Sequence, residues 1–390
     1  MKSKKKLIKL QYTIIGIIAM GLISCHQKQQ NSSLNPSGFK INRGVNLSHW
    51  LSQDFGWATK YNYINESDIR FIDSIGYDHV RIPIDEMEMW DSTGIPIKEA
   101  FKNLINCLGW CAKYNLRAIV DLHIVRAHYF NAGNEGMKNA LWTDSSAQKH
   151  FINLWVQLSG MLHTYSTKMV AYEILNEAVA PDNEDWNKLM NNAVAAIRRI
   201  EPGRVLIIGS NMWQIAPNLQ YLKLPEGDRN IILSFHTYSP LAFTHYKTNW
   251  TQIKYYKGHV HYPGQIITTD NYKKYIDTTN AALLTETSDA RDTFNKQRLI
   301  EVFKGGLEFA KSKNLQLYCG EFGCMPTVDR KERLAFYTDM ISALEQNNIA
   351  WCNWEYKGDF GIYFFDAEKK VSLKPDLELI KILMKYSRRK

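Results

Sequence analysis

Eight short runs of β-branched and apolar residues recur along this chain, and they constrain its fold more than any other feature. Segments with helical periodicity separate most of these runs, so strands and helices alternate. Such alternation predicts parallel strands joined by crossover helices. We expect the strands at residues 44–49, 79–84, 117–123, 170–177, 205–209, 231–238, 317–323 and 349–356, and the helices at 67–75, 101–114, 147–165, 186–200, 292–313 and 330–346.

Eight is also the number of strands that closes a (β/α)8 barrel. We therefore predict an α/β fold in which residues 40–390 form one (β/α)8 TIM barrel, with an extended loop after the sixth strand. The competing fold is an open doubly wound sheet. That fold usually carries a glycine-rich phosphate loop after its first strand, and no such loop follows residues 44–49.

The extended loop is rich in aromatic residues. A long irregular loop in a compact domain is usually functional, so this loop could form one wall of a glycan-binding site. The other interpretation is that its aromatic side chains only pack the loop against the domain. The residues concerned are Phe243, Tyr246, Trp250, Tyr255, Tyr256, His261 and Tyr262.

The N-terminus has the pattern of an export signal. Five lysines precede an apolar run from Tyr12 to Ile23, which is too short for a permanent membrane span. The run ends in Leu22-Ile23-Ser24-Cys25, which resembles a bacterial lipobox, although a simple membrane anchor with an incidental cysteine is the alternative. We predict a signal peptide over residues 1–24, lipidation of Cys25, and a flexible tether over residues 25–39. His26 favours attachment to the outer membrane, on its periplasmic or its exterior face.

Charge and cysteine content exclude several classes of function. The five signal-peptide lysines account for five of the nine net positive charges, and a remaining charge of +4 gives little support for nucleic-acid binding. Six cysteines in 390 residues are too few for a disulfide scaffold, and most of the five beyond Cys25 are expected to be buried thiols. No Cys-x-x-Cys motif or zinc-ligand spacing of histidines is present, so we expect no metal and no cofactor. We expect a monomer.

Polar residues stand at the ends of six predicted strands, where barrel enzymes carry their active sites. Two of them, Glu177 and Glu321, end the fourth and seventh strands. Glycoside hydrolysis uses two carboxyl groups that flank the scissile bond. A guanidinium keeps a neighbouring carboxylate ionised, and Arg81 is a candidate partner for Glu321. Glu173 shares the inward face of its strand and is interpreted as a structural acid paired inside the barrel.

Taken together, these segments resemble glycoside hydrolase family 5, the cellulase-like retaining (β/α)8 barrels. The resemblance runs from about residue 41 to 365, and it rests on the order and spacing of the segments. The matching segments are Arg43-Gly44-Val45-Asn46, His79-Val80-Arg81-Ile82-Pro83, Val120-Asp121-Leu122-His123, Tyr172-Glu173-Ile174-Leu175-Asn176-Glu177, His236-Thr237-Tyr238, Gly320-Glu321-Phe322-Gly323 and Trp354.

The resemblance implies a role for each matching residue. Glu177 would be the acid/base and Glu321 the nucleophile. The resemblance also implies that Asn176 binds the sugar 2-hydroxyl, that Arg81 and Tyr238 hydrogen-bond the nucleophile, that His236 lies near the acid/base and His123 near the substrate, and that Trp354 forms a platform under the reacting sugar. The family usually has proline after the Asn-Glu pair, whereas this chain has Ala178. Outside these motifs, His49 and Trp50 could line a subsite, or Trp50 could cap the barrel.

The resemblance implies retaining hydrolysis of β-glycosidic bonds in a polysaccharide or oligosaccharide, most simply by an endo-β-1,4-glucanase. A β-mannanase or a β-1,3-glucanase could be built on the same barrel. An alternative of a different class is a non-catalytic glycan-binding lipoprotein. A binding relic would be free to lose the catalytic set, so the presence of both acids with Arg81, Asn176 and Tyr238 favours the enzyme.

Overall fold

The computed structural model describes residues 35–54, 62–131, 139–366, 368–369 and 371–386. The predicted signal peptide and Cys25 lie outside these residues. Part of the predicted tether is described, and it is packed: Asn35 and Phe39 are buried, and the Asn35 side chain hydrogen-bonds the Phe39 backbone. The folded domain therefore includes Asn35 and does not begin at residue 40, because Phe39 and Ile41 fill the lower barrel interior. Within the described segments, no helix combines the length and apolarity needed to cross a membrane.

The predicted eight-stranded barrel is confirmed. Eight parallel strands close in the order β1-β10-β9-β6-β5-β4-β3-β2. Each overlaps one of the eight predicted runs, with differences of a few residues at the ends. The strands are β1 (Arg43–Asn46), β2 (His79–Asp85), β3 (Arg117–Ile124), β4 (Val170–Glu173), β5 (Leu206–Gly209), β6 (Ile231–His236), β9 (Gln316–Glu321) and β10 (Ala350–Asn353).

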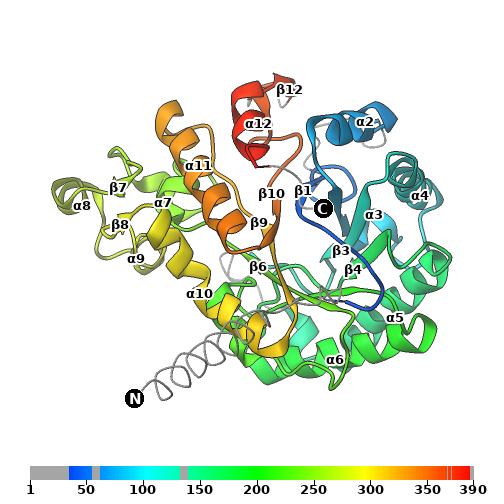
Figure 1. Cartoon of the computed structure of the whole chain (residues 1–390). Coiled ribbons are helices and arrows are strands. Elements are labelled where there is room, and N and C mark those ends of the chain that lie inside the picture. Colours follow the sequence, from blue (N-terminus) through cyan, green and yellow to red (C-terminus); the bar gives the residue numbers. More distant parts are fainter. Residues whose placement is uncertain (1–34, 55–61, 132–138, 367, 370, 387–390) are drawn as a thin grey trace, which may run out of the picture. The chain divides into compact units, whose positions relative to one another are not determined.

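Helices surround this barrel (Figure 1). The larger ones match the predicted helical segments, and all of these except α4 (Lys98–Lys113) begin at polar caps. Asn65 and Asp68 form a capping box on the first of them. Their apolar faces pack against the outer face of the strands. The helices are α2 (Glu66–Ile75), α3 (Glu86–Met89), α4 (Lys98–Lys113), α5 (Ser145–Leu162), α6 (Asn183–Ile200), α10 (Lys296–Lys313), α11 (Arg330–Gln346) and α12 (Leu377–Leu383), with 3-10 turns η2 (Ala140–Trp142) and η3 (Ala216–Tyr221).

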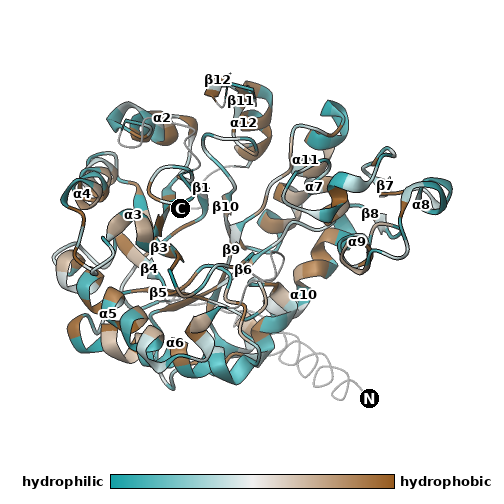
Figure 2. Ribbon diagram, turned by 180° about the vertical axis from the view of Figure 1, so that it is seen from behind, coloured by the Kyte–Doolittle hydropathy of each residue, from teal (hydrophilic) through white to brown (hydrophobic). Residues whose placement is uncertain are grey.

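The core has two apolar layers. The larger layer lies between the barrel and its helices, and a smaller one fills the lower barrel interior around Ile119, Ile207 and Tyr318. Figure 2 shows strands of the barrel in brown, whereas much of the helical surface is teal. Above the lower layer the barrel interior becomes polar, with Arg81 and Glu173 fully buried. The carboxyl ends of the strands therefore carry charge inside a rigid frame.

The extended loop after β6 folds into short elements of its own. Four of its aromatic side chains, Phe243, Tyr246, Tyr256 and Tyr262, are buried, so for these the packing interpretation is correct. Trp250 and Tyr255 remain 45% and 56% exposed. The elements are α7 (Leu241–Thr244), η4 (Gln252–Tyr255), β7 (Gly264–Gln265), α8 (Thr269–Tyr275), α9 (Ala281–Glu286) and β8 (Thr293–Phe294).

A hairpin that the sequence analysis did not predict follows the last barrel strand. It consists of β11 (Tyr363–Asp366) and β12 (Val371–Pro375), which pair antiparallel, and it leads into α12.

All five cysteines of the described domain are buried and free of disulfides, as expected.

Candidate active site

The structure brings eight sequence-predicted residues together at the carboxyl ends of the strands. Each is buried or nearly so, and hydrogen bonds or ring contacts connect them into one group. They are Arg81, His123, Asn176, Glu177, His236, Tyr238, Glu321 and Trp354. Only the predicted lipidation residue, Cys25, lies outside the described part of the chain.

Glu321, at the end of β9, is held by two donors. Arg81 donates from Nη1 to Oε1 at 2.7 Å, and the Tyr238 hydroxyl donates to Oε2 at 2.9 Å. Burial raises the pKa of Glu321, but the Arg81 charge and the Tyr238 hydrogen bond both act to lower it. Each oxygen therefore has a partner that favours the ionised form, as an attacking carboxylate requires.

Arg81 is itself enclosed by acids inside the barrel. Its guanidinium pairs with Glu173 at 2.6 Å and with Asp121 at 3.0 Å, as well as with Glu321. This confirms that Glu173 is paired within the barrel. Arg81 Nη2 also donates to Asn176 Oδ1 at 2.8 Å. Asn176 Nδ2 has no acceptor among the described residues, so this buried amide keeps its donors for another group.

Glu177 follows β4 and has a different environment. Its backbone is in the left-handed region, with φ 44°, and its N–H donates to Gln214 Oε1 at 2.7 Å. His236 Nδ1 lies 2.9 Å from Glu177 Oε1. Burial raises the pKa of Glu177 well above its usual range, and the negative charge of Glu321 raises it further. A carboxyl that keeps its proton near neutral pH is suited to general acid catalysis.

The two carboxyl groups face each other across a short gap. One carboxylate oxygen of Glu177 and one of Glu321 lie within 4.8 Å of each other and of a His236 nitrogen. Retaining glycosidases hold their carboxyl groups about 5–5.5 Å apart, whereas inverting enzymes need roughly 6.5–9.5 Å to admit a water molecule. A closest approach of two oxygens within 4.8 Å is compatible with the retaining spacing.

His123 and Trp354 complete one side of the site. Their rings stack, with centroids 5.7 Å apart and planes 10° from parallel. His123 Nδ1 is 2.8 Å from Asp121, and burial together with Arg81 lowers the pKa of His123 to about 3, so its ring is neutral. Its Nε2 has no partner among the described residues. Trp354 is only 8% exposed and also packs against Phe360.

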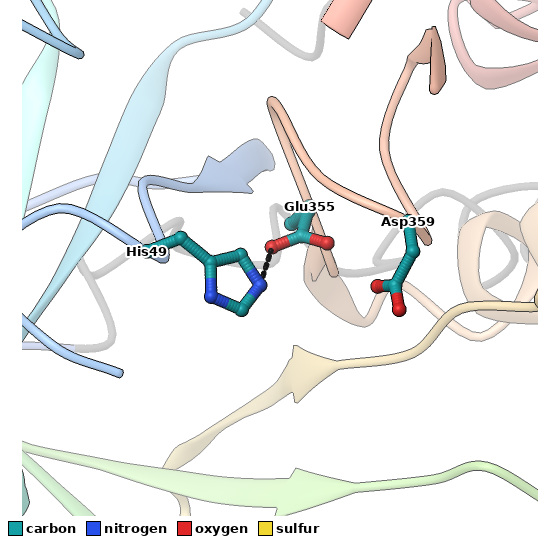
Figure 3. Close-up of side chains that lie close together, drawn as sticks. All are labelled: His49, Glu355 and Asp359. Atoms are coloured by element: carbon teal, nitrogen blue, oxygen red, sulfur yellow. Dashed lines mark ion pairs between the residues drawn. The ribbon is translucent and has the colours of Figure 1, made fainter. Parts of the chain in front are cut away.

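A second polar group lies beside Trp354; sequence analysis named its His49 as a possible subsite residue but did not find Glu355 and Asp359. His49 Nε2 is 3.1 Å from Glu355 Oε2 (Figure 3). The Ser48 hydroxyl donates to the same oxygen. Burial acts to lower the pKa of His49, but the Glu355 charge raises it overall. Asp359 completes the group, and burial and the Glu355 charge raise its pKa to about 7. Trp50 lies in the apolar core and does not line this group.

These two groups are also where a cation could be considered. In each of them, one histidine nitrogen and two carboxylate oxygens lie within 4.8 Å of one another. Arg81 already supplies positive charge to the Glu177–Glu321 group. In the other group, Glu355 is occupied by Ser48 and His49. Neither group therefore requires a metal to balance its charge.

Comparison with known proteins places this geometry in a family. Residues 34–359 match the family model described as cellulase (glycosyl hydrolase family 5). Endoglucanase C of Acetivibrio thermocellus is 35% identical over 346 residues, covering 87% of this chain and 97% of that protein. Cellodextrinase A of Ruminococcus flavefaciens is 27% identical over 314 residues, covering 80% and 84%.

Solved structures show the same fold at lower identity. Thermotoga maritima Cel5A in complex with cellobiose has a TM-score of 0.67 and 22% identity, covering 88% of this chain and 97% of that one. The cellulose synthase subunit Z of Clostridioides difficile has a TM-score of 0.69 and 21% identity, covering 88% and 100%.

Proposed function

This chain belongs to the cellulase family, glycosyl hydrolase family 5, and hydrolyses O-glycosyl bonds; from that premise we propose that it is a retaining endo-β-1,4-glucanase. The observation that carries the proposal is the pair Glu177 and Glu321, whose oxygens lie within 4.8 Å in contrasting environments. The 35% identical relative is named an endoglucanase, which supports a β-glucan as substrate. Membership of an enzyme family argues against the alternative of a non-catalytic binding protein.

In the proposed mechanism, Glu321 attacks the anomeric carbon while Glu177 protonates the departing glycosidic oxygen. The bond between sugar and leaving group breaks, and a covalent bond to Glu321 forms. Glu177, now ionised, takes a proton from water, which attacks the same carbon and releases Glu321. Two displacements at one carbon return the original anomeric configuration.

The surrounding side chains would assist these two steps. Arg81 and Tyr238 orient Glu321 and stabilise its charge before attack and after release. His236, 2.9 Å from Glu177, positions the acid. The unpaired amide of Asn176 is available to the sugar 2-hydroxyl, and Trp354 with His123 provides a flat aromatic surface beside the reacting ring.

Activity on a panel of polysaccharides, with sizing of the products, tests the proposal. We expect hydrolysis of β-1,4-glucan with a rapid fall in chain length, which indicates internal cleavage. Preferential hydrolysis of mannan or of β-1,3-glucan would overturn the substrate assignment. Mannan belongs in the panel because one of the similar structures is Thermotoga maritima Cel5A in complex with mannotriose.

We also propose that the protein is exported and lipid-anchored through Cys25, at the outer membrane, and that it acts as a monomer. The apolar run ending in Leu22-Ile23-Ser24-Cys25 supports the anchor. Membrane fractionation of Cys25→Ala against the unmodified protein tests the anchor.

A further inference from the structure

A cavity of about 200 Å³ lies between the β11–β12 hairpin and the start of α11. We call it the hairpin pocket. Aromatic and charged side chains make up most of its wall, and the catalytic pair is not part of it. Its lining includes Arg330, Arg333, Asp359, Tyr363, Phe364 and Phe365.

Asp359 connects the hairpin pocket to the active site. Besides lining the pocket, its carboxylate lies within 4.8 Å of a ring nitrogen of His49 and of a carboxylate oxygen of Glu355 (Figure 3). Glu355 directly follows Trp354, whose ring stacks on His123 in the active site. The pocket is therefore separated from the proposed sugar platform by one short loop, on the same end of the barrel.

The aromatic part of the pocket is exposed and held in place. Phe364 is 42% exposed, and two cations lie over its ring, the Arg330 guanidinium at 5.6 Å and the Lys374 ammonium at 5.7 Å from its centre. Arg330 is fixed by two hydrogen bonds to Asp376, at 2.5 and 2.7 Å, and by one to Glu378 at 3.1 Å. An exposed apolar ring flanked by cationic donors suits a pyranose, which has apolar C–H groups and hydroxyls around its edge.

Asp359 is the pocket acid that the pocket arginines leave unpaired, because both of them are directed to Asp376. Among the described residues Asp359 makes no ion pair, although a His49 nitrogen lies within 4.8 Å of its carboxylate. A half-buried carboxyl in this situation gains from hydrogen-bonding hydroxyl groups. The pocket is also smaller than the roughly 300–1,000 Å³ of sites for drug-sized ligands, which suits one sugar unit and not a chain.

We propose that the hairpin pocket binds a sugar unit other than the one being cleaved. The inference rests on the proposed function, because it takes the glycan in the active site as given. The ligand is a pyranose ring with free hydroxyls. This ring can be a distant backbone unit of a linear β-glucan or a branch of a decorated β-glucan.

Phe364→Ala tests the proposal, with Leu373→Ala as the matched control. Leu373 is 60% exposed on the partner strand of the same hairpin but does not line the pocket. The readout is kcat/KM on cello-oligosaccharides of two to six units, on branched xyloglucan oligosaccharides and on a short aryl cellobioside. Loss of one aromatic contact should lower kcat/KM by roughly 2- to 12-fold on ligands that reach the pocket, and leave the aryl cellobioside unchanged.

The pattern of loss identifies the source of the sugar. A loss confined to the longest linear substrates assigns a backbone unit, and a loss confined to branched substrates assigns a branch. An equal loss on every substrate, or none on any of them, overturns the proposal. Leu373→Ala should show neither the loss confined to linear substrates nor the loss confined to branched substrates.

Binding separates failure of the pocket from failure of the proposed function. Calorimetric titration in a Glu321→Gln background, with cellohexaose and a xyloglucan heptasaccharide, measures affinity without turnover. We expect Phe364→Ala and Asp359→Asn each to weaken binding of at least one of these ligands relative to Leu373→Ala. If all three variants bind alike, the pocket proposal is wrong even if β-glucan is cleaved. If wild-type enzyme cleaves only mannan, the substrate assignment fails, and the same comparison is made with mannohexaose.

Discussion

Replacing Tyr238 by phenylalanine removes one atom from the active site and should change the acidity of the proposed nucleophile. The Tyr238 hydroxyl donates to Glu321 Oε2 at 2.9 Å, and Arg81 holds the other oxygen at 2.7 Å. A donor to a carboxylate stabilises its ionised form, so removing the donor raises the pKa of Glu321. The acidic limb of activity must then move to higher pH.

The size of the shift follows from the kind of hydrogen bond that is lost. Hydrogen bonds to charged groups contribute about 1.5–3 kcal/mol, and one pKa unit corresponds to about 1.36 kcal/mol. Tyr238→Phe should therefore shift the acidic limb of kcat/KM upward by about 1–2 pH units. The plateau value of kcat/KM should change less than its acidic limb, because Arg81 still orients Glu321.

The assay is the pH profile of kcat/KM on an aryl β-cellobioside, whose limbs report groups of the free enzyme. Tyr262→Phe is the matched control, because the Tyr262 hydroxyl also donates to a carboxylate at 2.9 Å, that of Asp339 in α11. That control should leave the profile unchanged. An unmoved acidic limb in folded Tyr238→Phe, or an equal shift in Tyr262→Phe, would refute the reasoning.

Further predictions concern the two acids, the anchor and a buried arginine. Glu321→Ala should lose nearly all hydrolysis on every substrate and regain turnover with azide, giving inverted product, whereas Glu177→Ala should keep its first step on activated aryl glycosides and give a glycosyl azide of retained configuration. Near-native activity of both variants on polysaccharide would contradict the assignment. Proton NMR of wild-type product should show the β-anomer first; an α-anomer would indicate inversion. Cys25→Ala protein should leave the membrane fraction once its signal peptide is removed, and persistent membrane association after signal cleavage would exclude the lipid anchor. Arg204→Met should leave the buried acid Glu201 without its cationic partner. The free energy of unfolding in urea titrations should fall by about 3–5 kcal/mol, with kcat/KM per folded molecule unchanged.

Strand order and the catalytic end of the barrel could be predicted because they depend on repeated local patterns. Each buried strand is a short apolar run bounded by polar residues, and eight such runs leave few topologies. The polar residue that ends each run was placed at the barrel mouth by the same reasoning. Local pattern alone was therefore enough to bring Arg81 near Glu321.

Shorter elements and long-range contacts were not predictable in the same way. The β11–β12 hairpin has strands that are half-buried or exposed, so they lack the continuous buried apolar run that marks barrel strands of similar length. The packing of Asn35 and Phe39 depends on a hydrophobic space at the bottom of the barrel that only the closed fold creates. His49 and Glu355 meet because β1 pairs with β10 to close the barrel, and nothing local to either residue indicates the other.

The difference between the two catalytic glutamates also depends on long-range contacts, so local sequence pattern does not predict it. Glu177 and Glu321 are chemically identical, and both stand where a strand ends, so their positions alone cannot divide the roles of acid and nucleophile. Arg81 and Tyr238 approach Glu321, while the nearest polar contact of the Glu177 carboxyl is a neutral His236. Within 4.8 Å of each other, the two carboxyls cannot both ionise without cost, and the positive charge beside Glu321 decides that Glu177 keeps the proton. Three strands converging on one guanidinium thus create the asymmetry, and it is the contacts of Arg81 that keep Glu321 ionised as the nucleophile and leave Glu177 protonated as the acid.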